Sequence, residues 1–154
     1  IGAMSMIKTL QILLFFGLIM IVSACSTNAG TEQYIATNPD GYALGEQVYV
    51  QNCATCHGEN GEGQFPNAPT QPDSTGRIGA PPHNSNGHTW HHADALLYDI
   101  VRDGGMGNSE MFYPMPAFGE QLSDEEIESV IFYIRTFWTE EERQQQQAIS
   151  DASP

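Results

Sequence analysis

Cys53-Ala54-Thr55-Cys56-His57 brings two thiols and an imidazole together within five residues. Three kinds of site use a Cys-x-x-Cys pair: a redox-active disulfide, one half of a zinc site, and covalent attachment of haem. A redox disulfide is expected beside a βαβ pattern, which the chain lacks. A zinc site needs a second cysteine pair, whereas Cys25 is the only other cysteine.

Covalent attachment of haem gives both cysteines and the histidine a role. Two thiols three positions apart reach the two vinyl groups on one edge of a porphyrin, and the histidine that follows lies under the iron. We therefore predict one covalent haem c, attached through Cys53 and Cys56 with His57 as an iron ligand. Burial of the macrocycle also supplies a core that a small exported domain would otherwise lack.

A second iron ligand has to come from another part of the chain. Thioether sulfur is the usual choice where a high reduction potential is needed, and Met106, Met111 and Met115 are the candidates. Met115 lies in the stretch Pro114-Met115-Pro116, where two prolines stiffen the backbone on either side. We predict Met115 as the ligand, with Met111 and Met106 as alternatives.

Hydrophobic spacing predicts three helices around this stretch. The first begins at Asp40 or Gly41 and runs into Cys53. The second covers residues 94–102 and ends at a Gly-Gly pair. The third follows a capping box at residues 123–126. Residues 58–82 show no periodicity, and so long a loop needs something to pack against. The predicted buried residues of the three helices are Leu44, Val48, Tyr49, Leu96, Leu97, Ile100, Val101, Ile127, Val130, Ile131, Ile134 and Trp138.

The order of these features resembles a class I cytochrome c over residues 41–138. The features are a Gly45-x-x-x-Tyr49 helix, the 53–57 motif, the glycines at 58, 61 and 63, a Met-Pro pair and a terminal helix with a tyrosine. The resemblance implies a small all-α fold wrapped around one haem. It also implies that Gly45 packs against the stretch around Tyr133, and that the carbonyl of Pro81 or Pro82 accepts a hydrogen bond from His57.

The two ends of the chain differ in composition from this middle part. Lys8 precedes an apolar run over residues 10–22, and small residues lead to Cys25, as in a bacterial lipoprotein cleavage box. We predict a signal peptide at 1–25 with lipid on Cys25; an uncleaved membrane helix is the alternative. Residues 26–40 are expected to be a flexible tether, 41–139 the cytochrome c domain, and 140–154 a disordered, acidic and Gln-rich tail.

Charge restricts the partners. The formal net charge is −14, and all nineteen acidic residues follow Cys25. Such a chain repels nucleic acid and suits redox proteins with a basic docking face. A haem ligated by both His57 and Met115 has no open position for a substrate, so we predict an electron carrier rather than an enzyme. Lipid would tether it on the outer face of the cytoplasmic membrane or in the periplasm. The alternative is a haem sensor or enzyme subunit in which Met115 dissociates to admit a small ligand.

Four histidines remain unexplained by this account. Within ten residues lie His83, His88, His91 and His92. One alternative is that they bind copper or zinc in a metal-delivery module. Another is that one of them replaces Met115 as the iron ligand. Their spacing lacks the His-x-x-x-His pattern of a firm helical site. Nearby, Trp90 and Arg102 are predicted to donate hydrogen bonds to the haem propionates.

Overall fold

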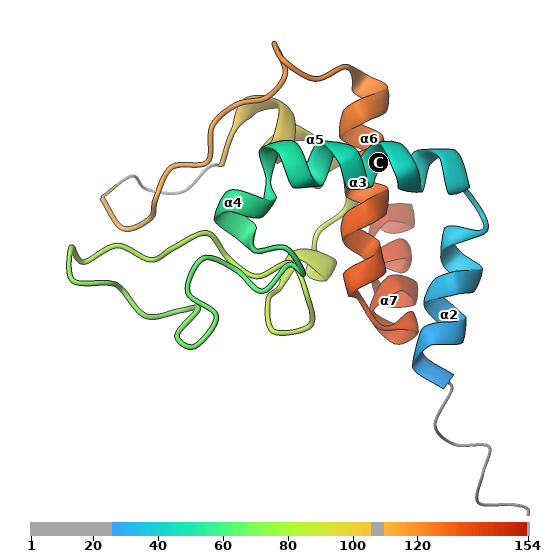
Figure 1. Cartoon of the computed structure of the whole chain (residues 1–154), viewed down its shortest axis with the longest axis horizontal. Coiled ribbons are helices and arrows are strands. Elements are labelled where there is room, and N and C mark those ends of the chain that lie inside the picture. Colours follow the sequence, from blue (N-terminus) through green and yellow to red (C-terminus); the bar gives the residue numbers. More distant parts are fainter. Residues whose placement is uncertain (1–25, 106–109, 154) are drawn as a thin grey trace, which may run out of the picture.

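The computed structural model describes residues 26–105 and 110–153, and within them the chain forms helices and no strand (Figure 1). Ile78 and Phe112 form one isolated parallel bridge. The predicted all-α class is confirmed. In chain order the elements are α2 (Ser26–Ile35), α3 (Pro39–Asn52), α4 (Ala54–His57), the 3₁₀ turn η1 (Thr89–His91), α5 (Asp94–Asp103), α6 (Asp124–Ile134), the 3₁₀ turn η2 (Arg135–Phe137) and α7 (Glu140–Ala152).

Helix α3 begins earlier than predicted. Its N-cap is Asn38, whose side-chain oxygen accepts a hydrogen bond from the backbone N–H of Gly41 at 3.0 Å. Pro39 occupies the first helical turn, where its missing N–H costs nothing. The predicted start at Asp40 or Gly41 is therefore wrong, because Asn38 already provides the oxygen that caps the helix.

Helices α3 and α6 cross at close quarters, as Figure 1 shows. Gly45 lies at the crossing, where a side chain would overlap the carbonyl oxygen of Ser129 and lie 2.9 Å from Cβ of Tyr133. The predicted contact between Gly45 and the stretch around Tyr133 is confirmed. This close approach fixes the direction in which α3 carries the chain toward Cys53.

The core lies between α3, α5 and α6. The capping box predicted before the last helix is confirmed: Ser123 and Glu126 exchange hydrogen bonds at the start of α6. Tyr49 and Val130 are completely buried. The predicted helix at 94–102 is observed as α5. The buried hydrophobic residues are Val48, Tyr49, Leu97, Val101, Phe118, Ile127, Val130, Ile131, Tyr133, Ile134 and Trp138.

Two segments predicted to be unstructured are helical. Residues 140–152 form α7, which starts with a second capping box at Thr139 and Glu142 and buries Arg143 and Gln146. Gln146 donates to the carbonyl of His92, so α7 packs against η1. The predicted disordered tail is wrong for these residues because their polar side chains find buried acceptors.

The prediction of a flexible tether at 26–40 is wrong for residues 26–35, which are helical. Residues 26–35 form α2, and the ring of Tyr34 stacks on Phe132 of α6 with centroids 4.5 Å apart. The guanidinium of Arg143 lies 5.1 Å from the same ring. None of the described helices is long and apolar enough to cross a membrane.

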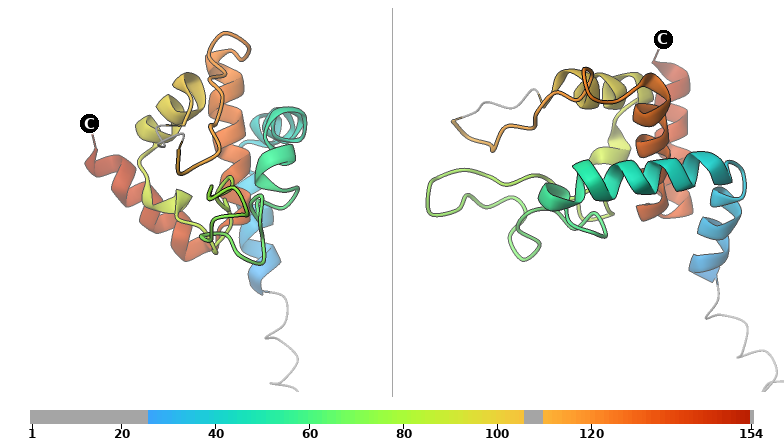
Figure 2. Two further views of the ribbon diagram at one scale, coloured as in Figure 1. Left: turned by 90° about the vertical axis from the view of Figure 1, so that its left-hand side faces the viewer. Right: turned by 45° about the horizontal axis from the view of Figure 1, so that its top comes forward.

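Long loops occupy the side of the molecule away from α2. The loop that follows α4 and the one that precedes α6 extend in the same direction in Figure 1 and in the right-hand view of Figure 2. Phe118 and Gly119 tie the second loop to α5, because their N–H groups donate to the carbonyls of Val101 and Arg102. The two loops, the end of α3, α5 and α6 enclose the candidate site.

Candidate functional site

The turn between α3 and α4 presents the two cysteines. Cys53 ends α3 and begins α4, and the N–H groups of Cys56 and His57 both donate to its carbonyl. Gly58, with φ of +83°, then ends α4 after one turn. The Cys53 thiol is half-buried at the cavity described below, while Cys56 is exposed.

His57 points inward and is held by the following loop. Its side chain is 6% exposed, and its Nδ1 lies 2.9 Å from the carbonyl oxygen of Pro81. This contact fits the hydrogen bond predicted from His57 to a proline carbonyl and selects Pro81 over Pro82. Because Nδ1 carries the proton in this bond, Nε2 is left with a free lone pair for a metal. Burial lowers the pKa of His57, partly offset by the Pro81 carbonyl, so the ring is neutral as a ligand must be.

The loop around His57 is tightly fixed to the core. The hydroxyl of Tyr49 donates to the Gly58 carbonyl at 2.8 Å. The N–H of Gly63 donates to the carbonyl of His57 at 2.7 Å, and the N–H of His83 donates to that of Gly61 at 2.8 Å. These bonds hold the Pro81 carbonyl and the imidazole in register.

An apolar cavity joins His57 to Met115. Both residues line it, together with Cys53 from the α3–α4 turn, and the remaining walls come from α5, α6 and the loop before η1. The structure thus brings three of the four predicted haem-binding side chains to one cavity, with Cys56 beside it on α4. The other lining residues are His83, Thr89, Leu97, Ile100, Val101, Val130, Ile131 and Ile134.

Among the three methionine candidates, Met115 alone lines this cavity within the described residues. Its side chain is half-buried and packs against the core. Met111 is 52% exposed, and Met106 lies outside the described residues. Cys25, the predicted lipid site, also lies outside them.

Comparison with known protein families indicates which cofactor this cavity holds. The family described as Cytochrome c matches residues 42–138. The chain belongs to the cytochrome c family. Haem c, bound covalently, is the cofactor of this family, and electron transfer is its general role. The matched residues begin in α3 and end at Trp138, so they include the whole cavity.

Individual relatives are subunits of redox enzymes. The cbb3-type cytochrome c oxidase subunit CcoP of Azospirillum brasilense is 32% identical over 91 residues, which cover 58% of this chain and 26% of that protein. The gluconate 2-dehydrogenase cytochrome c subunit of Pantoea cypripedii is 30% identical over 105 residues, 64% of this chain and 21% of that protein. The chain therefore spans about a quarter of the length of these relatives. No solved structure shows significant similarity to it.

The environment of Cys53 is not that of the activated thiol of a redox disulfide. Burial, and to a smaller extent the nearby Cys56, raises the pKa of the Cys53 thiol to about 11. Redox-active Cys-x-x-Cys motifs lower the pKa of one thiol so that it reacts as a thiolate. Cys53 is instead a neutral thiol at the edge of an apolar cavity, which suits a group that buries its apolar ring there.

The histidine cluster is divided by the fold. His83 lies in the haem cavity, where its ring stacks on His57 with centroids 4.0 Å apart and its Nδ1 lies 3.0 Å from Thr89 Oγ1. His88 and His91 are exposed, and the rings of His88 and His92 lie 5.2 Å apart. Within the described ranges no three His, Cys, Asp or Glu side chains come together to hold a metal ion. Apart from the position of His83 directly after Pro81 and Pro82, nothing in the sequence indicates its contact with His57.

A buried donor in η1, the turn whose Thr89 lines the cavity, fits a bound haem. Trp90 packs against the core, and its Nε1 is buried without a hydrogen-bond partner in the part of the chain that the structure describes. A buried N–H is normally satisfied, so this one fits an acceptor that is not protein, as a propionate would be. Arg102 forms surface ion pairs with Asp99 and Asp103, and its role toward a propionate stays a prediction.

Proposed function

We propose that this cytochrome is an electron carrier tethered outside the cytoplasmic membrane, with one haem bound through thioether links to Cys53 and Cys56. His57 and Met115 are the proposed iron ligands. Haem supplies an iron that gains or loses a single electron. With both axial positions taken by protein side chains, no position is open to a substrate, so we propose a carrier and not an enzyme.

The observation that carries this proposal is the placing of His57 and Met115 in the walls of one apolar cavity. Pro81 orients the histidine, and Pro114 and Pro116 stiffen the backbone around the methionine. Apolar walls from α5 and α6 exclude water, which lowers the local dielectric and favours the form of the haem with less charge. A thioether ligand acts in the same direction, so we expect a high reduction potential.

Replacing Met115 by alanine tests the carrier function. The variant leaves an axial position open, so its reduced form should bind carbon monoxide rapidly, whereas the parent protein should not. Exchange of axial ligands moves haem potentials within about 0.8 V, and we expect a fall on the order of 0.1 V here. Met111→Ala is the matched control and should behave like the parent. Rapid carbon monoxide binding by the parent protein would favour the sensor or enzyme alternative.

Lipid on Cys25 is the proposed membrane tether. Cys25 directly precedes the first residue of α2, and α2 is followed by the N-terminal end of α3. Cys53 lies at the other end of α3, whose fourteen residues span about 21 Å. The haem-binding turn would therefore lie well away from the lipid. Cys25→Ser is expected to move the protein from the membrane fraction to the soluble fraction without changing its haem spectrum; unchanged membrane retention would contradict the tether.

Charge supports redox partners with a basic docking face. The net charge is −14, and opposite charge speeds the encounter of two proteins at low salt. The relatives named above are subunits of an oxidase and of a dehydrogenase, so respiratory complexes are the proposed partners. Confinement by lipid at the membrane would raise the effective concentration of the carrier near them.

A further inference from the structure

The long loop after α4 makes an organised contact with the segment that carries Met115. Ile78 donates its N–H to the Met111 carbonyl at 2.8 Å and accepts one from Tyr113 at 3.1 Å. The two segments thus form a short parallel ladder around the Ile78–Phe112 bridge. A loop of this length without regular structure is uncommon in a small domain unless it has a role.

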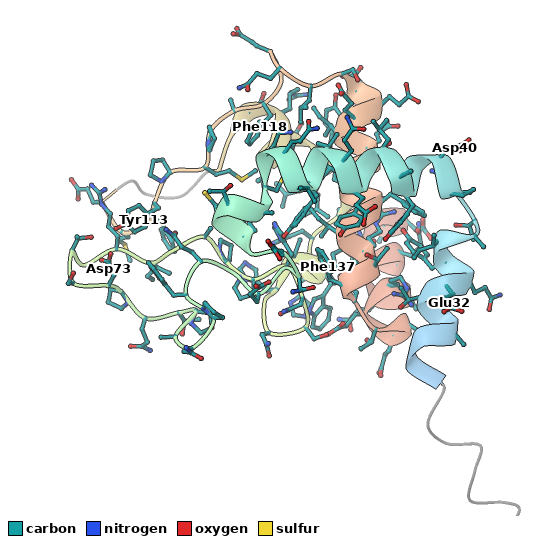
Figure 3. All side chains as sticks on the ribbon, viewed as in Figure 1. Glu32, Asp40, Asp73, Tyr113, Phe118 and Phe137 are labelled. Carbon is teal, nitrogen blue, oxygen red and sulfur yellow. The ribbon has the colours of Figure 1, made fainter. Side chains whose placement is uncertain are left out.

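Side chains reinforce this ladder at one point. The Tyr113 hydroxyl donates to Asp73 Oδ2 at 2.7 Å. The labelled side chains of the two residues approach each other from separate loops in Figure 3. The Arg77 guanidinium lies 5.7 Å from the centroid of the Tyr113 ring. Tyr113 is therefore held by backbone and side chain at once.

Asp73 is itself held in place to receive this bond. Its Oδ1 accepts hydrogen bonds from the backbone N–H and the hydroxyl of Thr75, at 2.8 and 2.7 Å. The backbone N–H of Asp73 donates to the Arg77 carbonyl at 2.8 Å. Hydrogen bonds from Thr75 and Tyr113 hold the pKa of Asp73 at about 2, so the carboxylate is an ionised acceptor at neutral pH.

Met115 follows Tyr113 by two residues and is fixed on its other side as well. The N–H of Gly105 donates to the Met115 carbonyl at 3.2 Å. A side chain on Gly104, whose φ is +92°, would lie 2.9 Å from that carbonyl, so the approach requires glycine. Only Pro114, with its fixed φ, separates Met115 from the Tyr113 contact.

We propose that residues 73–78 form a brace for the Met115 segment, in which Asp73 and Tyr113 are positioning residues that keep the Met115 sulfur at the iron. The proposal rests on Met115 being the axial ligand, as proposed above. Movement of the 111–115 segment would carry the sulfur away from the iron, and the brace opposes that movement by restricting the freedom of the segment. Neither residue touches the haem cavity, so the effect is transmitted through the backbone.

The test measures how easily exogenous imidazole displaces Met115 in the full, haem-loaded chain. In Tyr113→Phe and in Asp73→Asn we expect the apparent Kd for imidazole to fall about threefold to tenfold, the effect of one lost hydrogen bond. Tyr113→Phe removes the bond and Asp73→Asn weakens it by removing the charge of the acceptor, so the double variant should show no larger change than Tyr113→Phe alone. Loss of the far-red sulfur-to-iron absorption band during the titration reports how much of the Met115 sulfur has been displaced.

Tyr98→Phe is the matched control. The Tyr98 hydroxyl also donates to a carboxylate, that of Asp124, but it links α5 to α6 and not the two loops. Its imidazole affinity should equal that of the parent protein. Unchanged affinity in both Tyr113→Phe and Asp73→Asn, with the far-red band present in the parent, would overturn the brace alone. Absence of the band from the parent protein would overturn the Met115 ligand and the brace together.

Discussion

Replacing Gly45 by alanine is expected to lower the free energy of unfolding by about 3 kcal/mol. The added methyl group would overlap the Ser129 carbonyl, a backbone atom that cannot move without shifting α6. In an isolated helix the same change would stabilise by about 1 kcal/mol, so the sign of the effect reports the helix crossing. Denaturant unfolding of the haem-loaded protein, followed by circular dichroism, measures it.

Gly30→Ala provides the matched control for this substitution. Gly30 also lies in a helix, α2, but its new methyl group would meet only the Arg143 side chain, at an ordinary contact distance of 3.8 Å. We expect this variant to be as stable as the parent or slightly more so. Equal stability of the Gly45 and Gly30 variants would mean that α3 and α6 do not cross as described.

Removing both Cys53 and Cys56 should abolish covalent haem attachment. Cys53 caps the start of α4 next to the cavity and Cys56 lies within α4, and each is expected to form one thioether link. In the variant with both changed to alanine, acid–acetone should extract all the haem, and the polypeptide mass should lack the haem increment. Each single variant should keep one link and lose haem only partly.

The third cysteine is the control for this experiment. Cys25→Ser removes a thiol without touching α4, and we expect full covalent haem content in this variant. It should lose its membrane association instead, so the two sets of variants separate haem attachment from tethering. Haem that stays with the double alanine variant after extraction would contradict the assignment of Cys53 and Cys56.

The parts of the fold that sequence predicted well depend on local contacts. The Ser123–Glu126 capping box and the apolar stripe of α6 involve residues three or four positions apart, and the structure contains both. The contact of Gly45 with Tyr133 was predicted from the family resemblance, since nothing local indicates which helix a glycine faces. His57 and Met115 are predicted as ligands from the haem motif and from the proline context, and both line one cavity.

The parts that sequence missed depend on contacts between distant residues. Helix α7 buries Gln146, which binds the His92 carbonyl some fifty positions earlier. The polar composition of this segment predicts a disordered, solvent-exposed tail, whereas the Thr139-x-x-Glu142 capping box indicates the start of a helix. The brace joins Asp73 to Tyr113, and no periodicity in either loop predicts that hydrogen bond.

The measurement that tests the account most directly is the far-red absorption spectrum of the oxidised, haem-loaded full chain. If His57 and Met115 ligate the iron, the spectrum contains a weak sulfur-to-iron charge-transfer band, which disappears in Met115→Ala and persists in Met111→Ala. A parent protein without this band, or a Met115→Ala variant that keeps it, would contradict the proposed ligand set and the carrier function built on it.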